Sequence, residues 1–191
     1  MYELYDKIPS LISKIYLVDI GYSPEEIRST EGQVIEKTSS LPARIETAVV
    51  VMMDVLEHLE DDHAMLNAIR KNSKGENHFF ITVPAFMNLW SGHDVYLGHY
   101  RRYTKTTLNN LLSTCSFKRD TLYYVYGAVF PLVWIARKLS NKKEQPQSDM
   151  KPANPIINSM LKGLCSFEML FRKSNKVAGV TVVAEGRFFE E

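Results

Sequence analysis

The chain has 191 residues, of which 45% are hydrophobic and 24% are charged, a balance typical of one soluble globular domain with a sizeable core. Its formal net charge of +1 gives no electrostatic reason to expect a nucleic-acid partner. Cys115 and Cys165 lack the spacing of metal ligands, which suits a reducing cytoplasm. The N-terminal MYELYDKIPS has no basic region followed by an apolar run, so no signal peptide is predicted.

The first predicted elements alternate between helix and strand. Helical spacing of apolar residues over 1–15 precedes a strand at 15–21 that contains Asp19 near its end. The run Ser23-Pro24-Glu25-Glu26 predicts a helix start, because Ser suits the N-cap, Pro the first helical position and Glu the third. A weak strand with a loop follows at 33–40.

The clearest transition from strand to helix begins at Val49. Three valines and two methionines run into Asp54, which predicts a fully buried strand, and a helix is expected from about 57 to 71. Carboxylates favour a helix start because they face the positive end of its dipole. In parallel sheets, ligands bind at the carboxyl ends of the strands. Asp54, Glu57 and His58 therefore fall where a ligand site is expected.

The alternation continues to the end of the chain. The further predicted elements are a buried strand at 78–86, a polar and aromatic loop at 87–103, a helix at 104–116, a strand at 118–127, an apolar segment at 128–140, a polar loop at 141–155, a helix from about 155 to 172 and a closing strand at 179–188. This pattern predicts a single doubly wound α/β domain over 1–191, with a mostly parallel sheet. Two consecutive strands near the C-terminus predict an antiparallel edge.

The apolar segment 121–136 has two interpretations. Gly127 and Pro131 interrupt it and it is too short to predict a membrane span, so the first interpretation is a buried strand that leads into a core helix. The alternative is a membrane-facing or lipid-acceptor surface, formed with the basic residues that follow and the later amphipathic helix. This alternative predicts a cytoplasmic protein with peripheral inner-membrane contact through 121–143.

Two acidic positions at predicted strand ends stand out. Asp19 precedes a capped helix and can accept hydrogen bonds from both hydroxyls of a ribose, although a turn aspartate that stabilises the loop before Ser23 has the same pattern. Asp54 interrupts an apolar strand, where a charge costs free energy unless it is paired or hydrogen-bonded. The alternative for Glu57 and His58 is a simple helix start with a polar surface residue.

The loop 91–105 is the densest polar constellation, with His93, Asp94, His99, Tyr100, Arg101, Arg102 and Tyr103. His and Asp can transfer protons, and an arginine pair can hold an anion bidentately. The alternative is a surface loop whose Arg and Tyr side chains pack onto neighbouring helices. No further ligand set at suitable spacing accompanies the His-Asp pair, so no metal is predicted. No Ser or Cys sits in a nucleophile elbow, which argues against a hydrolase.

Three segments in a fixed order carry a family resemblance: DVLEHLEDD at 54–62, ITVPAFMNLWSGHD at 81–94 and GHYRRYTKTTLNNLL at 98–112. They resemble the class I S-adenosylmethionine-dependent methyltransferases, in particular the bacterial type 11 and type 12 methyltransferases. The resemblance covers roughly residues 15–120 with clear motifs. It implies a Rossmann-like sheet of order 3-2-1-4-5-7-6 and S-adenosylmethionine as the cofactor.

The resemblance also implies roles for individual residues. Asp19 and Ile20, at the end of the family's second strand, would bind the cofactor ribose. Asp54, Val55, Glu57 and His58 would border the methionine part of the cofactor. The loop after the fifth strand would supply the catalytic residues His93, Asp94 and His99, and the substrate-binding residues Tyr100, Arg101 and Arg102. The acceptor would be a small molecule, a glycan or a lipid-linked compound.

One family feature is absent from this sequence, namely a first strand followed by a glycine-rich D-x-G-x-G turn, whose glycines let the backbone approach the cofactor. Glu36 is the only candidate for the acidic residue that contacts adenine. Without the first strand, the strand at 15–20 pairs directly with that at 48–54, or another chain supplies a strand, for example in a homo-oligomer, or the chain is N-terminally truncated.

Three functions follow in order of preference. The first is an S-adenosylmethionine-dependent methyltransferase. The second is a non-catalytic methyltransferase-like protein that has lost the cofactor cradle and acts through a partner. A nicotinamide-dependent oxidoreductase comes last, because it needs the same missing glycine turn.

Overall fold

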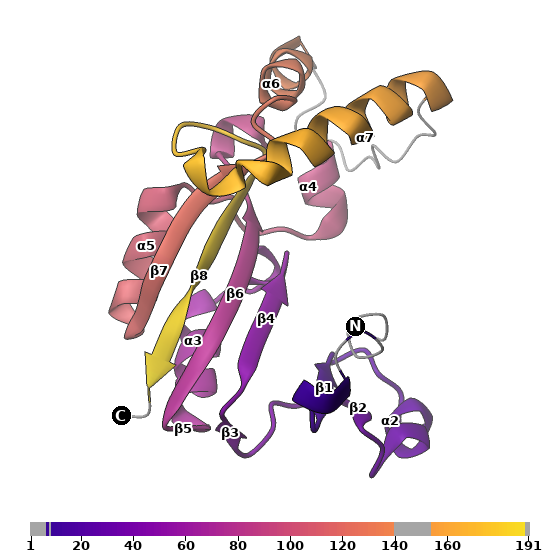
Figure 1. The fold of residues 1–191 in the computed structure, drawn as a ribbon, viewed down its shortest axis with the longest axis vertical. Coiled ribbons are helices and arrows are strands. Elements are labelled where there is room, and N and C mark those ends of the chain that lie inside the picture. The colour runs from indigo at the N-terminus through magenta and orange to yellow at the C-terminus, as the bar shows by residue number, and fades with distance from the viewer. Residues whose placement is uncertain (1–6, 8, 140–153, 190–191) are drawn as a thin grey trace. The chain divides into compact units, whose positions relative to one another are not determined.

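A computed structural model describes residues 7, 9–139 and 154–189 (Figure 1). The chain divides into two compact units, Met1–Ile45 and Glu46–Glu191, and each is described here by itself. The helix predicted over 1–15 falls partly outside the described residues. Its described part is not one continuous helix, because Pro9–Leu11 form the short 3-10 helix η1 and Ile15 already belongs to a strand. Most of the loop predicted at 141–155 also lies outside them.

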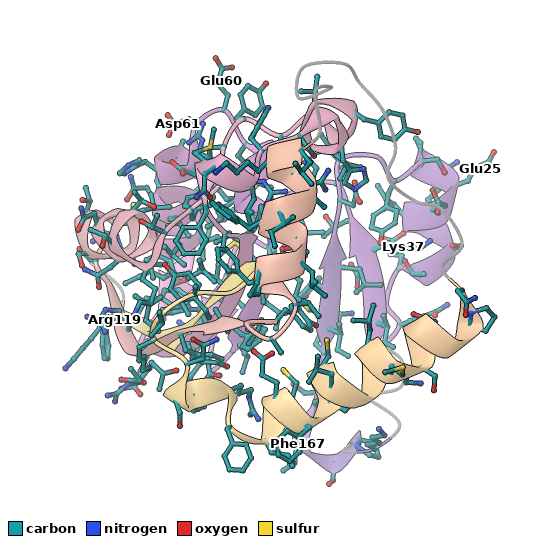
Figure 2. The ribbon with its side chains drawn as sticks, turned by 90° about the horizontal axis from the view of Figure 1, so that it is seen from above. Glu25, Lys37, Glu60, Asp61, Arg119 and Phe167 are labelled. Atoms are coloured by element: carbon teal, nitrogen blue, oxygen red, sulfur yellow. The ribbon has the colours of Figure 1, made fainter. Side chains whose placement is uncertain are left out.

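The first unit contains a parallel pair of strands joined by one helix. β1 (Ile15–Val18) pairs with β2 (Ile35–Thr38), and α2 (Pro24–Thr30) connects them. The predicted capping box starts α2, because the Ser23 hydroxyl accepts from the Glu26 N–H and the Glu26 carboxylate accepts from the Ser23 N–H. Lys37, labelled in Figure 2, donates to Glu26 at 2.8 Å and so ties β2 to α2. This hydrogen bond is the main reason that the pKa of Glu26 falls to about 2.

The second unit contains a four-stranded sheet in the order β4-β6-β8-β7. Its strands are β4 (Val49–Met53), β6 (Glu76–Pro84), β7 (Phe117–Val125) and β8 (Thr181–Phe189). β4 pairs with β6 in parallel, and β8 is antiparallel to both β6 and β7. Three strands therefore run in one direction, and the C-terminal strand runs against them. The prediction of a mostly parallel sheet with an antiparallel C-terminal strand is confirmed, although β8 lies inside the sheet and β7 forms its edge.

Helices flank and cap this sheet (Figure 1). They are η2 (Leu56–His58), α3 (Asp62–Lys71), η3 (Met87–Leu89), α4 (Gly92–Leu97), α5 (Lys105–Thr114), α6 (Phe130–Leu139), α7 (Pro155–Leu170) and η4 (Arg172–Ser174). Two short strands, β3 (Ile45–Glu46) and β5 (Ser73–Lys74), pair with each other. Leu66 and Ile69 of α3 are buried, as are Leu108 and Leu112 of α5. Consecutive buried residues of β6 (81–83) and β8 (182–184) complete the core, because apolar burial drives these layers together.

The strand pair of the first unit and the four-stranded sheet of the second match the predicted family order with its first strand left out. β1 and β2 correspond to the second and third strands, and β4-β6-β8-β7 corresponds to 4-5-7-6. Within each unit as described, β1 pairs with β2 and β4 pairs with β6. Direct pairing of the strands at 15–20 and 48–54 stays a prediction. No helix among the described parts of the chain is long and apolar enough to cross a membrane.

Four local predictions need correction. β4 is not fully buried: Val49 and Met53 are 64% and 62% exposed, because β4 is the outer strand of its sheet. The helix predicted from 57 begins only at Asp62, after the separate turn η2. The loop 87–103 contains η3 and the helix α4. The segment after β7 forms α6 but not a core helix, since none of its residues is buried.

Candidate functional site

The carboxyl ends of β4 and β6 meet at one end of the sheet, where the chain adopts unusual backbone conformations. Asp54 follows β4 with φ of 54°, and Phe86 follows β6 with φ of 58°. Positive φ is rare outside glycine and marks strain that surrounding contacts must hold. The Asp54 N–H donates to the Thr82 carbonyl at 3.0 Å, and the Thr82 hydroxyl lies 3.4 Å from the Asp54 carboxylate. These contacts hold the two strand ends together.

Glu57 lies in η2, directly after β4, and is fully buried. Neither of its carboxylate oxygens has a hydrogen-bond partner among the described residues. Its backbone carbonyl accepts from the Tyr100 N–H at 2.8 Å, which joins η2 to the loop after α4. Burial raises the pKa of Glu57 to about 8, since an ionised carboxylate is poorly solvated there. An orphaned carboxylate of this kind is a candidate for a functional site.

Asp94 is the centre of a buried ion network. It accepts from Arg102 Nε at 2.7 Å and from Arg102 Nη2 at 3.1 Å, and it contacts His99 Nδ1 at 3.0 Å. It also accepts from the Ser91 N–H as part of the capping box that starts α4. Burial alone would raise the pKa of Asp94, but Arg102 and His99 hold it below its usual range. Asp94 is therefore an ionised acceptor that fixes the position of its neighbours.

His99 and His58 lie beside each other although they come from different loops. Their ring centroids are 4.5 Å apart and the rings are nearly perpendicular. His99 is held by Asp94, whereas His58 is exposed to solvent. Burial lowers the pKa of His99 in spite of the nearby carboxylate, which favours the neutral imidazole. A neutral imidazole at the surface of a buried network can accept a proton or bind a metal.

A second buried contact fixes the loop that follows. Asp62 accepts from the Tyr103 hydroxyl at 2.7 Å and forms an ion pair with Arg101 at 3.0 Å. Burial and the Asp62 carboxylate raise the pKa of Tyr103, so its hydroxyl stays protonated. Arg101 and Arg102 are thus both engaged within the protein, and Tyr100 is the exposed member of the predicted substrate-binding group.

The structure brings together one part of the predicted site. Glu57, His58, Asp94, His99 and Arg102 form one cluster at the end of β4 and β6. Val55 precedes this cluster as the residue before η2. His93 lies on α4 and stacks on Tyr96, with ring centroids 6.5 Å apart.

Three further predicted residues belong to the first unit. The Asp19 carboxylate accepts from the Gly21 N–H at 2.8 Å, which is the turn contact expected under the alternative interpretation. Ile20 is 92% exposed. Glu36 forms an ion pair with Lys14. A role for these residues in cofactor binding stays a prediction.

Several contributors to the site were not predicted. One is Ser91, which forms a capping box with the predicted Asp94, and the spacing S-x-x-D is a sequence signal for α4 in the middle of the expected loop. Thr82 and Asp62 had no such signal. Thr82 reaches Asp54 across neighbouring strands, and Asp62 meets Tyr103 from 41 residues away, so both contacts depend on the tertiary fold.

Comparison with known proteins gives a fold but no family assignment by sequence. No family model and no curated protein matches the sequence. Among solved structures, similarity extends to a protein described as a methyltransferase, solved in complex with the Haloferax volcanii Trm112 methyltransferase activator, at 13% identity and a TM-score of 0.55, covering 100% of this chain and 78% of that one.

Two further solved structures are similar. One is described as a methyltransferase of Bacillus halodurans, at 11% identity and a TM-score of 0.51, covering 100% of this chain and 89% of that one. The other is a SAM-dependent methyltransferase from Archaeoglobus fulgidus, at 15% identity and a TM-score of 0.50, covering 97% of this chain and 81% of that one. The mixed sheet, its strand order and these similarities together show that the chain has the class I methyltransferase fold.

Proposed function

We propose that this protein is an S-adenosylmethionine-dependent methyltransferase that acts on a small-molecule, glycan or lipid-linked acceptor. The observation that carries the proposal is the cluster of Glu57, His58 and His99 beyond the carboxyl ends of β4 and β6. In open α/β sheets this end is where ligands bind. The solved structures of similar fold include a SAM-dependent methyltransferase, which supports the cofactor.

The proposed roles follow the order of the strands. Asp19 and Ile20 bind the cofactor ribose after β1, and Asp54, Val55, Glu57 and His58 border its methionine part after β4. His93 and His99 face the acceptor, and Tyr100 contacts it. The geometry suggests a refinement for two residues: Asp94 and Arg102 hold each other and orient His99, and so act as positioning residues.

The proposed reaction is an in-line displacement. S-adenosylmethionine, when bound, would supply the methyl group, which would pass from its sulfur to the acceptor oxygen or nitrogen and leave S-adenosylhomocysteine. A base of the 93–102 loop, His93 or His99 without a bound metal, would take the acceptor proton. Positioning of the two reactants supplies much of the rate, because it replaces a bimolecular encounter with a fixed geometry.

The second candidate is a non-catalytic protein with the same fold that acts through a partner. The Haloferax volcanii complex, in which a protein of this fold binds an activator, supports a protein partner for either function.

Calorimetry with S-adenosylmethionine separates the two functions. We expect binding that Asp19→Asn weakens about 10–100-fold, because a carboxylate that accepts from two ribose hydroxyls contributes roughly 1.5–3 kcal/mol. Glu25→Gln is the matched control, since Glu25 is an exposed acidic residue of the same unit (Figure 2), and its affinity should equal that of the parent protein. Absence of binding at millimolar cofactor would instead support the non-catalytic candidate.

The surface of α6 and α7 supports a lipid-linked acceptor presented at an anionic membrane surface. β7 leads into α6 and α7 leads back to β8, so both helices lie at the end of the sheet that carries the cluster (Figure 1). Their exposed apolar side chains include Leu132, Trp134, Ile135 and Leu139 on α6, and Met160, Leu164, Phe167 and Leu170 on α7. A groove of about 490 Å³ follows α7, lined by Phe167 and Phe171. Lys138, Arg172 and Lys173 place positive charge beside this surface, as interfacial helices do.

Vesicle co-sedimentation tests this surface. We expect the protein to bind vesicles that contain phosphatidylglycerol more than vesicles of phosphatidylcholine alone, and Phe167→Ser to reduce the bound fraction severalfold by removing an exposed aromatic side chain (Figure 2). Phe189→Ser is the control, because Phe189 is also exposed but lies at the far end of β8. An equal decrease of the vesicle-bound fraction in Phe167→Ser and Phe189→Ser, or no preference for anionic lipid, would argue for a soluble acceptor.

A further inference from the structure

We propose that Glu57, His58 and His99 form a binding site for a divalent transition-metal ion. Each residue offers one ligand atom, and these atoms all lie within 4.8 Å of one another. Two imidazole nitrogens and one carboxylate oxygen are a ligand set that suits zinc, iron, cobalt and nickel rather than magnesium, which prefers oxygen ligands. The site does not depend on the proposed methyl transfer, because metal binding is measured without cofactor or acceptor.

The first support is the missing partner of Glu57. Its carboxylate is fully buried and neither oxygen is hydrogen-bonded within the described residues. Arg102 is the nearby cation, but its guanidinium is already bound to Asp94 and to the Ala85 carbonyl. A buried ionised group without a counter-charge is costly, and a bound cation would supply that charge.

The second support is the orientation of His99. The Asp94 carboxylate is paired with the Arg102 guanidinium at 2.7 and 3.1 Å and so acts as an acceptor, which makes the His99 Nδ1 nitrogen at 3.0 Å the donor. This fixes the tautomer and leaves the lone pair on Nε2 available to a ligand. Metal-binding histidines commonly donate their other ring N–H to a carboxylate in this way, which orients the ring and raises its basicity. Arg102 and the Ser91 N–H hold Asp94 in turn.

His58 completes the set from the solvent side. Its ring lies beside that of His99, with centroids 4.5 Å apart. Metal–ligand bonds of roughly 2.0–2.2 Å place two ligand atoms at most about 4.4 Å apart, so a small rotation of this exposed side chain closes the site. Three protein ligands leave coordination positions for water or for an incoming oxygen or nitrogen group.

The test uses the untagged full chain, freed of metal with a chelator that is then removed, and titrated with Zn²⁺ by calorimetry and with Co²⁺ by visible absorption. We expect one equivalent to bind. His58→Ala is the main variant, because an exposed side chain can be removed with little risk to folding. We expect it and Glu57→Gln to weaken Zn²⁺ binding more than the roughly 10–100-fold typical of an outer-shell partner. His78→Ala, an exposed histidine near the start of β6, should bind as the parent does.

Two results would overturn the proposal. One is Zn²⁺ binding that His58→Ala and Glu57→Gln leave unchanged, or no Zn²⁺ binding at millimolar concentration. The other is a thiolate-to-Co²⁺ charge-transfer band that Cys115→Ser removes, because Cys115 and His63, whose Sγ and Nδ1 atoms are 3.6 Å apart, would then hold the ion. Methyl transfer by a metal-free protein would leave the metal site standing, so the two proposals fail separately.

Discussion

Asp94→Asn is expected to destabilise the second unit by about 3–5 kcal/mol, the cost of leaving one partner of a buried ion pair without its counter-charge. Asp94 is fully buried and the side chain of Arg102 is 8% exposed, so solvent cannot replace the lost carboxylate. Urea unfolding followed by tryptophan fluorescence measures this effect. Both tryptophans, Trp90 and Trp134, belong to the second unit, so the signal reports on that unit alone.

The matched control for Asp94→Asn is Asp120→Asn. Asp120 pairs with Arg187 at 3.4 Å on the surface of the same sheet, where both side chains are more than a third exposed. Exposed pairs contribute about 0–1 kcal/mol, so this variant should unfold close to the parent. Adding Arg102→Met to Asp94→Asn should recover part of the loss, since the unpaired charge is then removed. Similar losses in both single variants would show that burial does not strengthen the Asp94 pair.

The same ion pair gives stability a defined response to acid. Arg102 and His99 hold the pKa of Asp94 below its usual range, so the folded chain favours the ionised form. This contribution is fully present above the unfolded pKa, about 3.9, and is lost as the pH falls through the lower folded value. The free energy of unfolding of Asp94→Asn should therefore fall less steeply with decreasing pH than that of the parent.

The strands were predictable because their signals are local. The apolar runs at 49–53 and 181–184 and the capping box at Ser23 depend on neighbours in the sequence, and each produced the expected element.

The burial of the strand residues was less predictable than the strands themselves. Val49, Val51 and Met53 have the composition of a strand covered on both faces, yet they stay exposed because β4 has only β6 beside it. Composition reports what a strand can bury, whereas its position in the sheet decides what it does bury.

The site was predictable in place but not in its pairings. The end of a strand and a polar loop located Glu57, His58 and His99, but no sequence pattern indicated that the two histidine rings would meet or that Arg102 would be bound by Asp94. The sequence predicted a helix that starts at about Glu57. The break at Leu59 and the N-cap at Asp61 instead place this carboxylate in a buried turn.

Glu57→Gln is expected to stabilise the metal-free second unit at alkaline pH by on the order of 5 kcal/mol, measured by urea unfolding in the presence of a chelator. Burial raises the pKa of Glu57 to about 8, so the folded chain holds this proton more tightly than the unfolded chain, whose value is about 4.3. The parent is therefore most stable, as far as this group is concerned, below about pH 4, and loses stability as the pH rises to about 8.

Glutamine removes that loss, because its neutral amide occupies nearly the same volume without ionising. The two proteins should differ by less than about 1 kcal/mol at pH 5 and by the full amount at pH 9. Glu60→Gln is the control, since Glu60 is an exposed glutamate of the same loop (Figure 2) and its substitution should leave the protein close to the parent in stability. An equal pH response of the parent and Glu57→Gln would mean that water or a side-chain movement already solvates the carboxylate, and its burial could then no longer explain why this position needs a cation.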